Sequence, residues 1–160
     1  MTSQERAQIL ESYRTAYDQL VEGIKQFPTE MWDSRPTSEH WTIHEIIVHL
    51  ADADANSFIR MRRFIAEPGL SLMVYDENSW VKNLDYAGQS TDEALELFRW
   101  LRQNTYKLIK DLPEEVWAHT EFHSDNGQMN TDDLLNATER HVPNHLQQMG
   151  EIYQAWQASK

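Results

Sequence analysis

The stretch Thr131–Trp156, TDDLLNATERHVPNHLQQMGEIYQAW, decides how the fold of this chain is interpreted. Its pattern predicts one long amphipathic helix. His141 and His145 lie four residues apart, so their side chains sit one turn apart on one face. Six further residues fall on or beside this face, namely Leu134, Ala137, Thr138, Met149, Ile152 and Trp156. Two histidines inside a largely apolar stripe need partners, because burying an unpaired polar ring is costly.

Two interpretations of this histidine pair are open. Paired helical histidines at this spacing bind zinc in known enzymes, so a metal site is one interpretation. The other is that each ring hydrogen-bonds inside the core. The chain has no cysteine, so any metal must be held by His, Asp or Glu. A rival pair, His119 and His123, lies in a polar stretch where we expect no helix, which disfavours it.

The composition narrows the function classes. The 160 residues fit one domain, residues 1–160, and the net charge of −12 argues against a nucleic-acid binder. The basic cluster Arg60, Arg62 and Arg63 is interpreted as a solvated helix end. No apolar run is long enough to span a membrane, and the N-terminus has no apolar signal core. We therefore expect a soluble, cytoplasmic protein.

Three further helices are expected over about residues 3–26, 43–66 and 90–111. The second has the fullest start signals, with Thr42 as the cap, Glu45 three residues later, and a Trp41–Ile46 hydrophobic staple. The connector 70–89 is long enough to cross the end of a bundle, so that the next helix runs parallel to the previous one, or to cover a site.

A short repeat supports a bundle. Residues 27–32 (FPTEMW) and 112–117 (LPEEVW) share the order apolar, Pro, any residue, Glu, apolar, Trp. Each copy follows a long helix and precedes a loop and another helix. Two such halves predict a four-helix bundle. On the second helix, His49 lies at the border between the apolar side and a polar stripe, where its ring can point inward.

The ordered set of motifs resembles the DinB/YfiT-like family of four-helix bundle metalloenzymes. The motifs are Trp41–Asp52 (WTIHEIIVHLAD), a long loop with Trp80, the Leu112-Pro113-x-x-x-Trp117 turn, and His141-x-x-x-His145-x-x-Gln148. The resemblance covers essentially the whole chain. It implies an all-α, up-down-down-up four-helix bundle with a long connector between its second and third helices.

The resemblance also implies a site and a chemistry. A divalent metal would be held by His49, His141 and His145, and the chain would form a homodimer. Family members resemble thiol-dependent transferases or isomerases that use low-molecular-weight thiols, or hydrolases. Three imidazoles leave a metal position open, as in catalytic zinc sites. All-nitrogen ligation suits zinc or nickel.

Glu45 and Asp52 lie one turn on either side of His49. They are therefore candidates to orient its second nitrogen or to move a proton. Gln148, one turn beyond His145, is interpreted either as a ligand-binding residue or as a residue that only packs within the bundle.

We expect a metal-dependent enzyme, either a hydrolase or a thiol-dependent transferase, that acts on a small molecule and has no nucleic-acid or membrane partner. The alternative is a bundle without catalysis. Its metal would be structural or vestigial, or its histidines would hydrogen-bond in the core of a protein that binds a small molecule or another protein.

Overall fold

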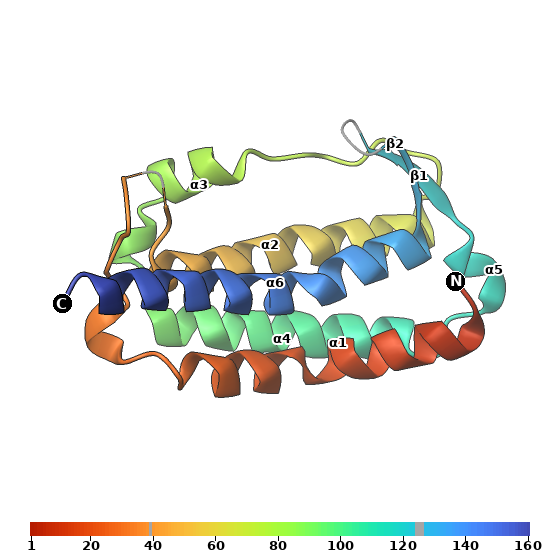
Figure 1. Cartoon of the computed structure of the whole chain (residues 1–160). Coiled ribbons are helices and arrows are strands. Elements are labelled where there is room, and N and C mark those ends of the chain that lie inside the picture. Colours follow the sequence, from red (N-terminus) through yellow and green to blue (C-terminus); the bar gives the residue numbers. More distant parts are fainter. Residues whose placement is uncertain (39, 124–126) are drawn as a thin grey trace.

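Four long helices form the body of the protein in the computed structural model, which describes residues 1–38, 40–123 and 127–160 (Figure 1). These helices are α1 (Ser3–Ile24), α2 (Ile43–Ala66), α4 (Thr91–Ile109) and α6 (Thr131–Ala158). α2 runs opposite to α1, α4 runs parallel to α2, and α6 returns parallel to α1. This is the predicted up-down-down-up order. In the ring of packed helices, α2 and α1 lie on opposite sides, each between α4 and α6.

The helix starts follow the sequence signals. Thr42 and Glu45 form a complete capping box at the start of α2, and Ser90 caps α4. Asn130 caps α6, which continues through Pro143 as one helix. The two Pro-x-Glu repeats each form a single helical turn, the 3₁₀ turn η1 (Thr29–Met31) and the short helix α5 (Glu114–Trp117).

The two connectors are more ordered than the sequence indicates. The connector 70–89 contains the short helix α3 (Glu77–Asn83) and the 3₁₀ turn η2 (Tyr86–Gly88). The polar stretch before α6 forms a hairpin of β1 (Thr120–His123) and β2 (Gly127–Asn130), with Thr120 opposite Asn130. The first connector pairs with this hairpin, because the backbone N–H of Leu72 donates to the carbonyl of Phe122. This long-range pairing explains why two short strands form where local sequence indicates only a loop.

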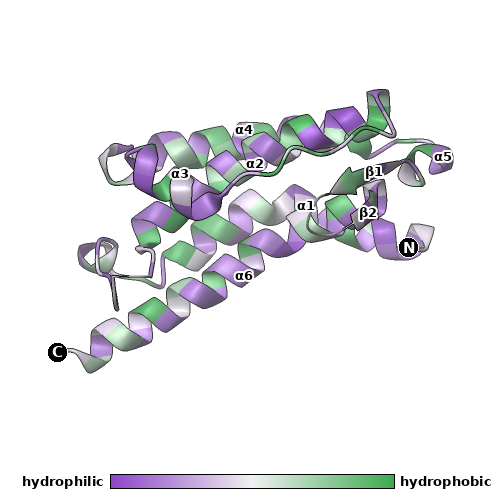
Figure 2. Ribbon diagram, turned by 90° about the horizontal axis from the view of Figure 1, so that it is seen from above, coloured by the Kyte–Doolittle hydropathy of each residue, from purple (hydrophilic) through white to green (hydrophobic). Residues whose placement is uncertain are grey.

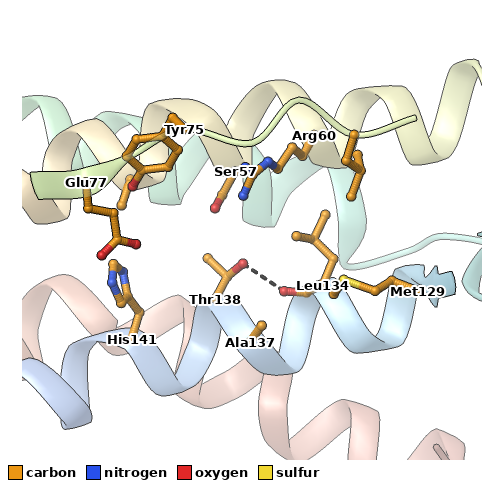
Figure 3. A pocket seen from close by; sticks show the side chains of 11 residues that line it. Ser57, Arg60, Tyr75, Glu77, Met129, Leu134, Ala137, Thr138 and His141 are labelled. Atoms are coloured by element: carbon orange, nitrogen blue, oxygen red, sulfur yellow. Dashed lines mark hydrogen bonds between the residues drawn. The ribbon is translucent and has the colours of Figure 1, made fainter. Parts of the chain in front are cut away.

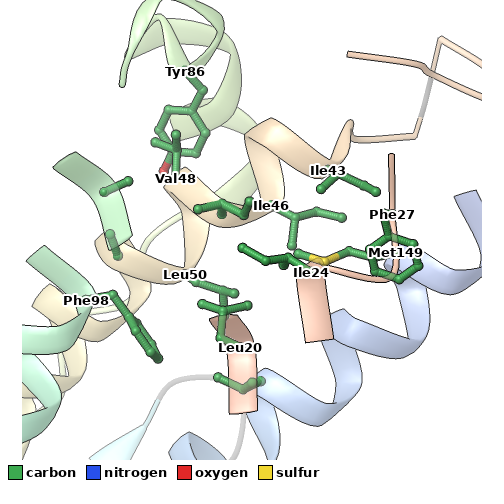
Figure 4. Close-up of a cluster of buried hydrophobic side chains, with 14 of the residues drawn as sticks. Leu20, Ile24, Phe27, Ile43, Ile46, Val48, Leu50, Tyr86, Phe98 and Met149 are labelled. Atoms are coloured by element: carbon green, nitrogen blue, oxygen red, sulfur yellow. The ribbon is translucent and has the colours of Figure 1, made fainter. Parts of the chain in front are cut away.

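Among the residues that the structure describes, the core has two apolar clusters, one at each half of the bundle. The first surrounds the start of α2 (Figure 4) and includes Leu20, Ile24, Ile43, Ile46, Leu50, Phe98 and Met149. The second includes Tyr13, Met61, Phe64, Ile109, Trp117, Leu134 and Leu135. Figure 2 shows hydrophobic and hydrophilic residues alternating around the long helices, as amphipathic packing requires.

A buried ion pair lies between the two clusters along the helices. Asp54 of α2 and Arg102 of α4 are each 2% exposed, and Arg102 Nε donates to Asp54 Oδ2 at 2.5 Å. Arg102 Nη2 also donates to the carbonyl of Thr138 on α6 at 2.8 Å. The pair therefore ties three helices together. Within the residues that the structure describes, no helix is long and apolar enough to cross a membrane.

Candidate metal centre

The structure brings together the three histidines that the family resemblance indicates. His49 projects from α2, and His141 and His145 project from α6. Their candidate ligand nitrogens all lie within 4.8 Å of one another. The Nε2 of His141 is 3.2 Å from the Nε2 of His49 and 2.9 Å from the Nε2 of His145. Residues that are 92 positions apart in the chain thus meet at one point.

These distances fit a shared ion better than a chain of hydrogen bonds. The Nε2 of His141 faces both other rings, but one imidazole nitrogen carries either one hydrogen or one lone pair and cannot serve two such contacts. Nitrogens about 2.0–2.1 Å from a tetrahedral zinc ion lie about 3.3 Å apart, close to the observed spacing. The donor set therefore suits a divalent transition metal.

The environment keeps the three rings neutral. Burial, followed by the proximity of His145, lowers the pKa of His49 to about 3. Burial, followed by the two neighbouring histidines and Arg102, lowers the pKa of His141 to about 2. Burial also lowers the pKa of His145, although its hydrogen bond to Gln148 opposes this shift. A neutral imidazole is the form that ligates a metal.

Gln148 fixes the orientation of one ring. The Nδ1 of His145 is 2.8 Å from the Oε1 of Gln148. An amide oxygen only accepts, so His145 Nδ1 carries the hydrogen and its Nε2 is free to ligate. The Nδ1 of His49 is buried and has no hydrogen-bond partner among the described residues.

The two carboxylates predicted to assist His49 are engaged elsewhere. Glu45 caps α2 through the backbone N–H of Thr42 at 2.8 Å, and Arg35 Nη2 donates to its other oxygen at 2.5 Å. Asp52 accepts a hydrogen bond from the Tyr86 hydroxyl at 2.6 Å. In the part of the chain that is described, neither makes a hydrogen bond to His49, so the predicted orienting contacts are absent. A role for either carboxylate in proton movement stays a prediction.

The rival pair, His119 and His123, is not on a helix, as expected. It belongs to the turn and strand before Gly127. The Nδ1 of His119 lies 2.9 Å from the carbonyl oxygen of Phe64, so a hydrogen bond to the backbone satisfies this ring nitrogen. The side chain of His123 lies outside what the structure describes.

Trp41 forms an aromatic wall beside the histidines. Its ring centroid is 4.7 Å from that of His49 and 6.3 Å from that of His145, and it is nearly parallel to the latter ring. Sequence reasoning assigned this residue only to the start of α2, because a hydrophobic staple explained its position.

Two cavities adjoin the histidine cluster. One, of about 190 Å³, lies between α2 and α6 beside His141, and the other, of about 330 Å³, is lined by Trp41, His145 and Gln148. Glu77, at the start of α3, lines both cavities. Its carboxylate points toward the ring of His141 (Figure 3).

Sequence reasoning missed Glu77. Its one indirect signal was the length of the connector, which indicated a segment that can cover a site. Partial burial raises the pKa of the Glu77 carboxyl, and the charge of Arg60 opposes this rise. The arrangement thus places a carboxylate across from the candidate metal ligands, on an element separate from theirs.

Comparison with known proteins identifies relatives of this chain. A curated relative, "Putative metal-dependent hydrolase OB0782" of Oceanobacillus iheyensis, is 28% identical over 117 residues, which cover 73% of this chain and 67% of the relative. "Putative metal-dependent hydrolase YfiT" of Bacillus subtilis is 25% identical over 134 residues, covering 81% of this chain and 75% of the relative.

Two solved structures share the fold. The structure of YfiT from Bacillus subtilis, described as a probable metal-dependent hydrolase with an unusual four-helix bundle topology, has a TM-score of 0.87 at 19% identity and covers 95% of this chain and 87% of that one. The mycothiol-dependent maleylpyruvate isomerase has a TM-score of 0.72 at 14% identity, with 94% of this chain and 61% of that chain covered. A family model described as the DinB superfamily matches residues 9–149. The chain therefore belongs to the DinB superfamily.

Proposed function

We propose that the protein is a metal-dependent enzyme that acts on a small molecule, with His49, His141 and His145 as the metal ligands. The observation that carries this proposal is the convergence of three neutral imidazole nitrogens on one point. Zinc and nickel are the proposed metals, because both accept all-nitrogen ligation. Three protein ligands leave at least one coordination position for a small molecule, as in catalytic rather than closed structural sites.

Hydrolysis is the first candidate reaction. A bound divalent metal would supply a nucleophile by lowering the pKa of a water molecule toward neutrality. The names of the two curated relatives as metal-dependent hydrolases support this candidate. Glu77 is placed to accept the proton of the attacking water, since its carboxylate faces His141 across the first cavity. Trp41 packs beside the His49 and His145 rings, and Gln148 holds the ligating tautomer of His145.

Thiol-dependent transfer is the second candidate reaction. The observation that favours it is the second cavity beside His145, which gives space for another molecule on a different side of the cluster. A low-molecular-weight thiol could occupy one cavity while an electrophilic substrate occupies the other. The fold relative that is a mycothiol-dependent isomerase supports this assignment.

The first test is metal content, measured by mass spectrometry on protein purified without a metal-affinity column. We expect about one zinc or nickel ion per chain, and its loss in His141→Ala. His44→Gln is a matched control, because His44 is also on α2 but its ring bonds Thr91 and the carbonyl of Tyr86. Protein that contains no metal and binds neither zinc nor nickel on addition would overturn the proposal.

A second measurement separates catalysis from a structural metal. Metal-loaded protein is assayed against a panel of activated esters and amides, and against electrophiles with and without small thiols. Activity lost in His49→Ala supports an enzyme. If the metal-loaded protein is inactive in all of these assays and His49→Ala only lowers thermal stability, the alternative is supported, namely a bundle whose metal is structural or vestigial.

We also propose that the protein acts in the cytoplasm as a homodimer. Three large apolar side chains at helical spacing on α4, Leu97, Trp100 and Leu108, are 46%, 52% and 38% exposed and form a candidate contact surface. Light scattering after gel filtration tests the dimer, and Trp100→Glu is expected to give a monomer. A monomeric unmodified protein would contradict this proposal.

A further inference from the structure

The first cavity is a groove that leads away from the histidines along two helices. On α2, Arg60 follows His49 by 11 positions, which places it within about 20° of the same face and about 16 Å further along the axis. Ala53 and Ser57 line the wall between them, and Leu134, Ala137 and Thr138 of α6 line the opposite wall. Residues Tyr75 and Glu77 of the connector lie across this groove (Figure 3).

Arg60 brings a positive charge to this cavity without a direct ion pair, although the carboxylate of Glu77 lines the same cavity. Among the described residues it forms no ion pair, whereas Arg63 pairs with Glu67 and Arg102 pairs with Asp54. Its Nε and Nη2 both donate to the carbonyl of Met73, at 3.2 and 2.6 Å, which holds the guanidinium in place. The sequence-based interpretation of this residue as part of a solvated helix end did not indicate that Arg60 lines the cavity that contains His141.

Further polar groups of the cavity are free to bind a ligand. Both Ser57 and Tyr75 line the cavity, and within the described part of the chain their hydroxyls make no hydrogen bond to protein. The hydroxyl of Thr138 is committed to the carbonyl of Leu134. Burial lowers the pKa of Arg60, but an arginine stays charged throughout the physiological range.

The size and lining of the cavity limit what it can hold. Its volume of about 190 Å³ is below the range of about 300–1,000 Å³ that is typical of pockets for drug-sized ligands, which favours a small occupant. Leu72, Met129, Leu134 and Ala137 offer apolar surface for a short carbon chain. Arg60 brings positive charge to the part of the cavity away from His141, so a negative group is favoured there.

We propose that the cavity binds a small organic acid, with its carboxylate on Arg60 and its reacting group at the His141 end. The planar fork of a guanidinium matches a carboxylate, and Ser57 and Tyr75 supply additional donors. This inference names the substrate class of the proposed enzyme, so the position of the reacting group rests on the proposed metal function.

The test uses cobalt-loaded protein and thiol probes that carry a metal-binding group at one end. The probes are ω-mercapto acids of increasing length, from mercaptoacetate to mercaptooctanoate, each beside its neutral amide, and affinity is read from the thiolate-to-cobalt absorption band. We expect one chain length to bind about tenfold or more tightly as the acid than as the amide, the size that a charge-assisted hydrogen bond gives. The preferred length reports the reach from the metal to Arg60.

Substitutions of Arg60 test whether this residue causes the preference for the acid over the amide. Arg60→Gln is expected to abolish the preference for the acid while leaving the affinities for the amides unchanged. Arg60→Lys retains the charge, so part of the preference should remain. Arg63→Gln is the control, because Arg63 lies three residues away, carries the same charge and does not line this cavity.

The outcomes separate this inference from the proposed function. If cobalt gives no absorption bands with the protein, the metal proposal fails and the inference fails with it. If cobalt binds but no acid is preferred over its amide, or if Arg60→Gln keeps the preference, only the organic-acid inference is overturned. An equal loss of preference in Arg63→Gln would assign the effect to general charge and would also overturn it.

Discussion

The buried pair Asp54–Arg102 gives a prediction whose size follows from the structure. Asp54→Ala would leave the guanidinium of Arg102 2% exposed and without its carboxylate. Removing one partner of a buried ion pair costs about 3–5 kcal/mol of unfolding free energy, because the remaining charge is not compensated. At about 2–4 °C per kcal/mol for a domain of this size, Tm should fall by about 6–20 °C.

The same substitution should also weaken the candidate metal centre. Arg102 binds the carbonyl of Thr138, one turn before His141 on α6, while Asp54 follows His49 on α2. Losing the pair loosens the packing that positions the two histidines, so we expect lower zinc affinity in Asp54→Ala.

Urea unfolding followed by circular dichroism measures the stability, and zinc titration measures the affinity. Asp54→Asn keeps an acceptor for Arg102 and should cost less than Asp54→Ala. The double variant Asp54→Leu/Arg102→Met removes both charges and should recover part of the loss, since replacing a buried pair by apolar residues is often close to neutral. A cost below about 1 kcal/mol for Asp54→Ala, the size typical of exposed pairs, would refute the reasoning.

Further predictions concern the site itself. In metal-free protein, the folded-state pKa of about 3 for His49 and about 2 for His141 lies below the ordinary 6.5. The unfolded chain therefore takes up protons first, and stability should fall as pH drops from about 6.5, by about 2 kcal/mol per histidine at about pH 5. Urea unfolding at about pH 6.5 and about pH 5 measures this loss. His141→Gln should remove only part of it, because burial also lowers the pKa of His49 and His145. Stability that is equal at the two pH values would contradict the assignment. Glu77→Gln should lower the hydrolysis of an activated ester by about 10²-fold or more with the metal content unchanged, as expected for loss of a general base; unaltered turnover in that assay would exclude the role. Cobalt binding should quench tryptophan fluorescence, and most of this quenching should disappear in Trp41→Phe because that ring packs on His49; equal quenching in the variant would place the ion elsewhere.

The sequence by itself determined the long helices, because their signals are local. Caps such as Thr42 with Glu45 act within one turn, and the apolar periodicity gives each helix its buried face. The proximity of His141 and His145 is also a local feature, because two residues four positions apart on one helix lie on the same face. For His49, periodicity indicated only a ring that can point inward, and the family resemblance supplied its place in the set.

Tertiary structure decided everything that depends on contacts between distant segments. His49 reaches the α6 pair only because the helices pack with a particular rotation and offset, which no single helix encodes. The path of the connector 70–89 placed Glu77 over the histidines and placed the Met73 carbonyl where it holds Arg60 in the cavity. The same packing places Asp52 where it accepts a hydrogen bond from the Tyr86 hydroxyl, and not beside the ring nitrogen of His49. Local patterns fix the direction of a side chain on its own helix, whereas the group that it meets there is set by the packing of the whole chain.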